Sequence, residues 1–126
     1  MNAHEEKFRP VTTTEKAVLG KLLEAKFPGW DILAQQLVGL QGKQIDAEGS
    51  LRLLVTTAAA APVSGVVVEA RYPDLDTKSD VDAHVNILLH VAAGKLSVLE
   101  IYKDDGSTIL KAPNPTELQL FSRYNP

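Results

Sequence analysis

The 126-residue sequence contains no cysteine, which excludes a disulfide framework, a thiol nucleophile and a thiolate metal site. It also has no excess of positive charge: 13 Lys and Arg stand against 16 Asp and Glu, for a formal net charge of -3. Nucleic acid and membrane surfaces are therefore not expected as partners, because both attract basic proteins. We expect the fold to be stabilised by packing alone.

No long apolar run is present either: no stretch approaches the roughly 20 apolar residues that a membrane-spanning helix requires. The N-terminal residues lack the apolar segment of a signal peptide, so we expect a cytoplasmic protein that starts at Met1. A hydrophobic content of 44% and a charged content of 23% are typical of a globular domain. We predict a flexible N-terminal tail over residues 1–11 and a single α+β domain over residues 12–126.

Helical patterning is confined to the N-terminal part of the chain. Thr12 stands three residues before Glu15, as in a capping box, and apolar residues follow at helical spacing up to residue 26. The sequence Phe27-Pro28-Gly29 should end this helix, and the apolar spacing favours a second short helix over residues 30–38.

From residue 40 onward the pattern is that of strands. Apolar runs separated by glycine turns predict strands over residues 40–46, 50–56, 63–72, 83–91, 95–103 and 108–111, with a polar, mobile loop over residues 73–82. Helices followed by strands indicate an α+β fold: two N-terminal helices packed on one face of a five- to six-stranded, mainly antiparallel meander sheet. The other face is left to polar residues or to a partner.

The predicted hairpin around Gly94 is the most informative part of the chain. Its first strand has apolar residues at every second position from Val85 to Val91, which predicts one buried face. On the second strand the adjacent pair Val98-Leu99 breaks this alternation, so either a bulge lies there or both faces are partly covered.

The turn at the tip of this hairpin determines which side chains meet. A two-residue turn would place Ala93 at positive φ, which costs energy, so we predict a three-residue turn with only Gly94 in that conformation. The resulting register pairs Val91 with Lys95, Ile87 with Leu99, Val85 with Ile101, His84 with Tyr102, Asn86 with Glu100 and His90 with Leu96.

One polar patch on the open face is the candidate site for a ligand or a partner. A histidine beside a carboxylate is a pair that general acid–base catalysis uses, although polar side chains on an open sheet face are also ordinary. The candidate residues are His84, Asn86, Glu100 and Tyr102 from the hairpin, with Glu69 and Arg71 from the preceding strand.

Metal and cofactor motifs are not evident. His84 and His90 lie six residues apart on one strand, or about 20 Å, which is too far for both to bind one ion. The alternating aspartates of residues 74–82 suggest calcium, but the loop lacks the glycine and the final glutamate of an EF-hand. We therefore expect a solvated acidic loop, no metal and no cofactor.

Several stretches resemble a family of small uncharacterised bacterial proteins. They are residues 68–74, 85–91 and 96–106, together with Arg9-Pro10-Val11-Thr12, so the resemblance covers most of the chain. It implies a domain without an established activity. The Leu-Glu-Ile-Tyr strand followed by Asp-Gly is also similar to strands of bacterial immunity proteins, and this likeness implies a protein partner.

The functional hypothesis that follows is a non-enzymatic binding domain, in the manner of an immunity protein, that uses the polar sheet face or the loop over residues 73–82. One alternative is a small enzyme or ligand-binding protein with a pocket on the polar sheet face. Another is a homodimer formed through the sheet.

Overall fold

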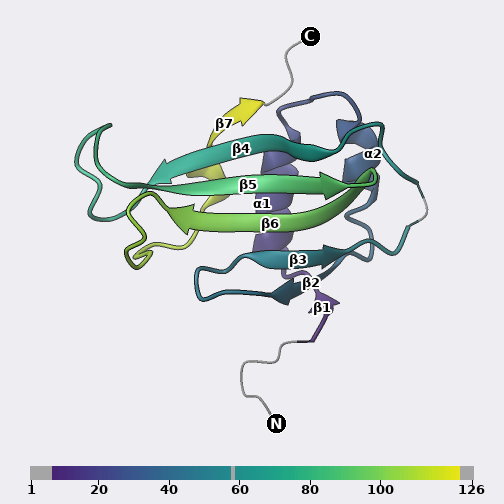
Figure 1. Ribbon diagram of the computed structural model, residues 1–126, viewed down its shortest axis with the longest axis horizontal. Helices are drawn as coiled ribbons and strands as arrows, with labels where there is room; N and C mark the ends of the chain where they lie inside the picture. The colour runs from purple at the N-terminus through teal and green to yellow at the C-terminus, as the bar shows by residue number, and fades with distance from the viewer. Residues whose placement is uncertain (1–6, 58, 123–126) are drawn as a thin grey trace.

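The computed structural model describes residues 7–57 and 59–122, which form one open β-sheet with two helices against one of its faces (Figure 1). The helices are α1 (Thr13–Leu23) and α2 (Trp30–Gln35), and a 3-10 turn, η1, spans Pro115–Glu117. The strands are β1 (Arg9–Pro10), β2 (Gln41–Gln44), β3 (Leu51–Leu54), β4 (Gly65–Pro73), β5 (His84–Ala92), β6 (Lys95–Lys103) and β7 (Gln119–Ser122).

The sheet has seven strands in the order β1-β2-β3-β6-β5-β4-β7, and every neighbouring pair is antiparallel. This confirms the predicted α+β class with two N-terminal helices. The order departs from a continuous meander, because β3 pairs with β6 and the chain crosses to β4 through residues 55–64. Strands β4, β5 and β6 then form a meander that returns to β3.

Two strands were not predicted and one predicted strand is absent. β1 and β7 are short strands at the two edges of the sheet. β1 contains Pro10, and β7 follows the segment that Pro113 and Pro115 interrupt. The predicted strand over residues 108–111 is wrong: this segment has no ladder partner, and the Leu110 N–H instead donates to the Asp74 carboxylate at 2.8 Å. Of the predicted tail, residues 1–6 lie outside the described residues, whereas Arg9–Pro10 form β1. The boundary between tail and domain stays a prediction.

The first helix begins where the capping box predicts. The Thr12 hydroxyl accepts the Glu15 N–H at 3.1 Å, and the Glu15 carboxylate accepts the Thr12 N–H at 2.9 Å. Both helices are shorter than expected, ending at Leu23 and Gln35. No helix of the described part of the chain combines the length and the apolar character needed to cross a bilayer.

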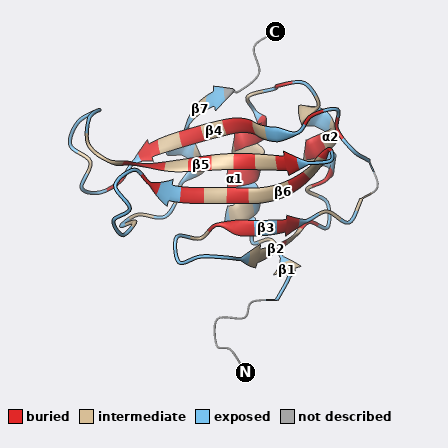
Figure 2. Ribbon diagram, viewed as in Figure 1, coloured by how far each residue is buried: buried red, intermediate tan, exposed pale blue. Residues whose placement is uncertain are grey.

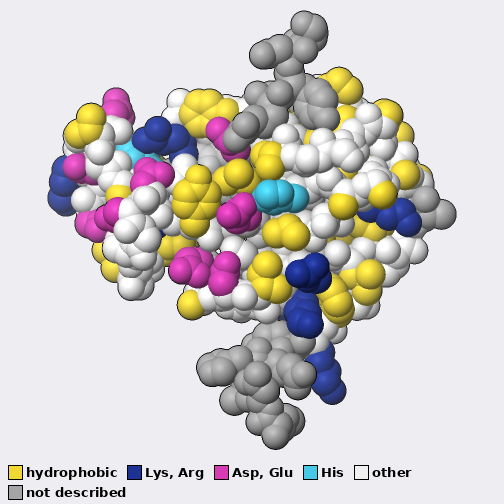
Figure 3. Space-filling view, in the orientation of Figure 1, with side chains coloured by type: hydrophobic (Ala, Val, Ile, Leu, Met, Phe, Trp, Pro, Cys, Tyr) yellow, Lys and Arg dark blue, Asp and Glu magenta, His cyan; other side chains and the backbone are white. Residues whose placement is uncertain are grey.

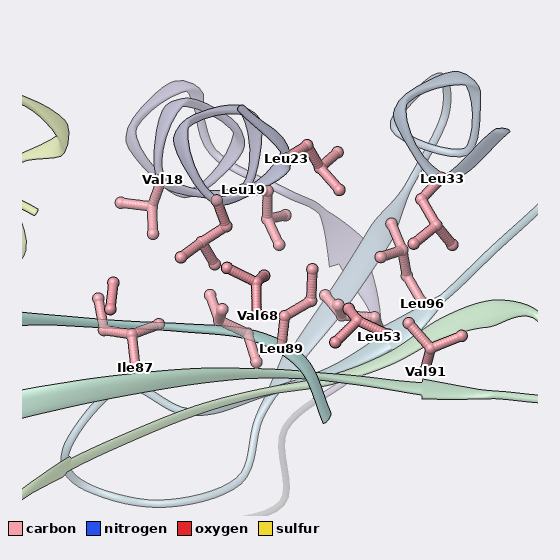
Figure 4. Packing of buried hydrophobic residues seen from close by; sticks show 14 of the residues in the cluster. Val18, Leu19, Leu23, Leu33, Leu53, Val68, Ile87, Leu89, Val91 and Leu96 are labelled. Carbon is pink, nitrogen blue, oxygen red and sulfur yellow. The ribbon is translucent and has the colours of Figure 1, made fainter. Parts of the chain in front are cut away.

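The core lies between the helices and one face of the sheet. In Figure 4, Val18 and Leu19 of α1 point toward Val68, Ile87 and Leu89 of the strands beneath. Along β5 and β6 buried positions alternate with less buried ones, as the red and tan bands of Figure 2 show. The predicted period of two is therefore confirmed, and within residues 7–57 and 59–122 both helices lie on one face of the sheet, so that no described helix covers the second face (Figure 1).

The predicted hairpin turn is wrong. The tip is a two-residue turn in which both Ala93 and Gly94 have positive φ, 51° and 76°. Gln36, fully buried, donates from its amide to the Gly94 carbonyl at 2.9 Å and accepts the Leu96 N–H at 3.0 Å. These bonds fix both sides of the turn, which explains how the less favourable conformation of Ala93 is tolerated.

A bulge follows the turn and sets the register of the rest of the hairpin. The pairing shifts between His90↔Val98 and Val91↔Leu96, so Ser97 has no direct partner. A bulge was one of the two explanations that the Val98-Leu99 pair left open, and it lies just before that pair, at Ser97. Turn and bulge together move the pairing by two residues from the predicted register, so that Ile87 faces Ile101. A shift of two preserves the side-chain faces, and the predicted core positions are therefore buried.

Candidate functional site

Four of the six predicted site residues lie around one depression on the uncovered face of the sheet. It has a volume of about 290 Å³ and is lined by Glu69, Arg71, Asn86 and Tyr102, together with Leu88 and Phe121. Cross-strand pairing explains the grouping: Arg71 pairs with Asn86, which in turn pairs with Tyr102. Residues that pair directly across strands place their side chains on the same face, a few ångströms apart.

The predicted partners within this patch need correction. Tyr102 faces Asn86 rather than His84, and Glu100 faces Leu88 rather than Asn86. His84 lies four residues along β5 from Leu88, or about 13 Å, so it is beyond hydrogen-bond reach of Glu100. A His84–Glu100 proton-transfer pair is therefore excluded.

Glu100 does pair with a histidine, but it is His90. The Nε2 atom of His90 lies 2.8 Å from the Glu100 carboxylate, and the predicted contact of His90 with Leu96 is wrong because His90 pairs with Val98. The two side chains are 35% and 44% exposed. Solvent screens such a pair, so it contributes little to stability and stays open to a ligand or a partner.

His84 belongs to the structure at the base of the hairpin instead. It is buried, and its Nδ1 lies 2.8 Å from the Asp82 carbonyl, under the loop that joins β4 to β5. The adjacent Asp104 carboxylate accepts the His84 N–H at 2.9 Å and the Asn86 amide. The His84 backbone bond is the main cause that lowers the pKa of Asp104; burial raises it, and the Asn86 bond lowers it further.

The acidic loop over residues 73–82 is exposed at most of its positions, as predicted, but it is anchored to the domain at Asp74, which was not predicted. Asp74 is buried, and its carboxylate lies 3.0 Å from the Lys103 ammonium, which also lies 2.8 Å from Asp76. Burial raises the pKa of Asp74, but bonds from the Leu110 N–H, Lys103 and the Leu75 N–H outweigh it and lower the pKa. Bonds to Asp76 and Asp74 raise the pKa of Lys103. Both groups are therefore charged, and each is paired.

Acidic groups elsewhere do not assemble into a metal site. Among residues 7–57 and 59–122, no three His, Asp or Glu side chains come together in a way that would hold an ion. The aspartates of the β4–β5 loop are used otherwise: Asp74 holds Lys103, and Asp82 accepts the N–H groups of Lys78 and Ser79.

Sequence reasoning identified Tyr102 but missed the other exposed apolar side chains of the uncovered face, Leu54 and Phe121. Leu54, Tyr102 and Phe121 expose 45%, 41% and 40% of their surface there, from three different strands. Figure 3 shows this face, on which apolar side chains in yellow are interspersed with single charged ones. The sequence did contain one indication of an apolar outer face, because Leu88 lies at an outward position of the alternation along β5. Phe121 could not be found in this way, since it lies on β7, which was not predicted.

Fold and site together define the class of protein: a small α+β domain whose open antiparallel sheet has one packed face and one mixed apolar and charged face. The chain belongs to the family described as a domain of unknown function, DUF6984, which matches residues 8–113. The resemblance to a family without known activity is thus confirmed. No curated protein and no solved structure matches the chain.

Proposed function

We propose that this protein is a non-enzymatic binding domain that docks a protein partner on the uncovered sheet face. The observation that carries the proposal is the set of half-exposed Leu54, Tyr102 and Phe121 spread across that face. Aromatic and aliphatic side chains in such a setting are the usual anchors of protein interfaces. A bacterial, cytoplasmic protein with an immunity-type role, in which binding itself is the function, is the finer form of this proposal.

The charges around these anchors favour a protein partner of mixed polarity. Glu69 and Glu100 are interspersed with Arg71 and Arg52 on the same face, as their pairing positions require. Alternating signs give no net attraction for a uniformly charged ligand such as a nucleic acid and suit a partner with complementary charges. The net charge of -3 points the same way.

The geometry gives less support to the enzyme alternative. The histidine–carboxylate pair that the described residues form on this face, His90 and Glu100, has both side chains partly exposed to solvent. General acid–base catalysis uses groups in a site that excludes water, and neither His90 nor Glu100 lines the depression of about 290 Å³ on this face. We therefore favour binding over catalysis.

Site-specific photo-crosslinking in the native host tests the proposal. A benzoylphenylalanine at position 102 should form one dominant adduct with another protein, whereas the same group at Glu24, at the end of α1, should not. Phe121→Asp should reduce the adduct from position 102 at least fivefold. Equal adducts from both positions, or none from position 102, would refute a partner on this face.

The same experiment distinguishes the homodimer. An adduct of twice the mass of the chain identifies a second copy as the occupant, and light scattering then has to show a dimer that Phe121→Asp dissociates. A purified chain that stays monomeric at high concentration removes that alternative.

A further inference from the structure

A separate apolar cavity lies on the opposite side of the sheet, beside α1. It has a volume of about 420 Å³, within the range of small-molecule sites, and Val18, Leu99 and Ile101 form its apolar floor. The β2–β3 turn and the segment from Thr108 to Pro113 form its walls. None of the residues predicted from the sequence for a site lines this cavity.

The cavity exists because the helical layer is narrower than the sheet. Seven strands span about 29 Å, whereas the 11-residue α1 is about 16 Å long and packs over β4. Beside it, β3 and β6 separate after two paired positions. The buried Ser50 hydroxyl bridges the separation by accepting the Ile101 N–H at 2.9 Å and donating to the Ile101 carbonyl at 3.2 Å.

Each wall of the cavity is held by contacts that do not depend on a filled interior. The start of α1 is fixed by the capping box and by the Arg9–Glu15 ion pair. The Asp46 carboxylate accepts the N–H groups of Glu48 and Ser50 and so fixes the β2–β3 turn. The far wall is tied to buried Asp74 through the Leu110 N–H. Walls held in this way give a preorganised site, which lowers the cost of binding.

The charge at the mouth indicates the kind of ligand. Both oxygens of Glu15 are occupied by Arg9 and Thr12, so its charge is neutralised. Glu48 also lines the cavity, is exposed, and has no partner for its carboxylate among the residues that the structure describes. An apolar floor with one unneutralised carboxylate at the rim complements a molecule with an apolar body and a single positive charge.

We propose that this cavity binds a small ligand composed of an apolar body and a protonated amine, with the body over Leu99 and Ile101 and the ammonium at Glu48. The proposal is independent of the uncovered face, which lies on the other side of the sheet. It requires no covalent step, because burial of the apolar body and one charge contact supply the binding.

Three probes of matched shape test the proposal on the full chain: cyclohexylmethylamine, cyclohexylmethanol and cyclohexanecarboxylate. In NMR titrations the amine should shift the methyl signals of Val18, Leu99 and Ile101 with saturation. The alcohol should bind about fivefold more weakly, which is the loss expected for one exposed charge contact, and the carboxylate more weakly still. Absence of saturable shifts at these methyls would overturn the proposal, as would equal affinity for amine and carboxylate.

Two substitutions test the charge contact and the open volume of the cavity separately. Glu48→Gln should weaken amine binding about fivefold and leave alcohol binding unchanged, whereas Glu24→Gln, the same change away from the cavity, should alter neither. Ala112→Trp should block all three probes by filling the mouth. Undiminished binding by the tryptophan variant, with a native spectrum, would place the probe elsewhere and refute the site.

Discussion

The β5–β6 hairpin is held at its two ends by buried polar contacts and is uncovered in its middle. At the tip, buried Gln36 bonds to both sides of the turn, and at the base Asp74 and Lys103 form a buried ion pair. The His90–Glu100 pair between them is as short, at 2.8 Å, yet it faces solvent. Contacts of similar length therefore differ in their role. The buried Asp74–Lys103 pair holds the strands in place, whereas the exposed His90–Glu100 pair lies on a surface that a partner can contact.

If buried contacts hold the ends of the hairpin, the largest loss of stability is expected from a substitution at its base. Asp74→Asn removes the buried one of the two carboxylates that face Lys103, leaving only the exposed Asp76, and should lower the free energy of unfolding by about 3 kcal/mol. Urea denaturation measures the change. Asp80→Asn, an exposed position of the same loop, is the matched control and should stay within about 0.5 kcal/mol of the parent. Equal effects of the two substitutions would contradict the comparison.

A smaller effect is expected at the tip. Gln36→Leu leaves the buried Leu96 N–H without its acceptor and should cost about 2 to 3 kcal/mol in urea denaturation. Gln35→Leu, the neighbouring exposed position, changes the same atoms without a buried bond and should be nearly neutral. If Gln36→Leu proves as stable as Gln35→Leu, the tip is not held by this side chain.

Acid should weaken the contacts at the base of the hairpin and so destabilise the fold. The pKa values of Asp74 and Asp104 are lowered in the folded protein from an ordinary value of 3.8. Their stabilising contribution is therefore present above about pH 4 and is lost as the pH falls through the lowered values. Denaturation between pH 7 and pH 2 should show this loss, with a shallower slope for Asp74→Asn. An identical slope for parent and variant would show that Asp74 does not carry the effect.

The smallest expected effect is a gain at the turn. Ala93 is exposed and has a φ of 51°, a conformation that asparagine adopts more readily than alanine. Ala93→Asn should raise the free energy of unfolding by about 0.5 to 1 kcal/mol, measured by urea denaturation. Ala92→Asn, at the extended position before it, should give no gain; a gain there would show that the turn geometry is not the cause.

Alternation along the chain was sufficient to predict the faces of the sheet. Val85, Ile87 and Leu89 are buried as expected, and Arg71, Asn86 and Tyr102 meet on the other face. The register was not predictable, because it depends on Ala93 adopting a positive φ in a turn that buried Gln36 supports, and Gln36 lies 58 residues before Gly94 in the chain. A shift of two residues keeps each side chain on its predicted face but changes its cross-strand partner. Asn86 and Tyr102 therefore lie together as expected, whereas the histidine beside Glu100 is His90 and not His84.

The end of the hairpin shows a second limit of sequence reasoning. An acidic loop is usually solvated, and nothing local marks Asp74 as different from Asp80. The difference arises from Lys103 and Leu110, which reach Asp74 only after the sheet has formed. The cavity beside α1 was likewise invisible, since it results from the unequal widths of two layers and not from a motif.

The most direct test of the account is the photo-crosslinking yield from position 102, measured in the parent and in Phe121→Asp at equal stability. The account predicts a protein adduct in the parent and at least a fivefold lower yield in the variant, with free energies of unfolding within about 0.5 kcal/mol of each other. An unchanged yield would contradict the claim that the uncovered middle of the sheet is the contact surface.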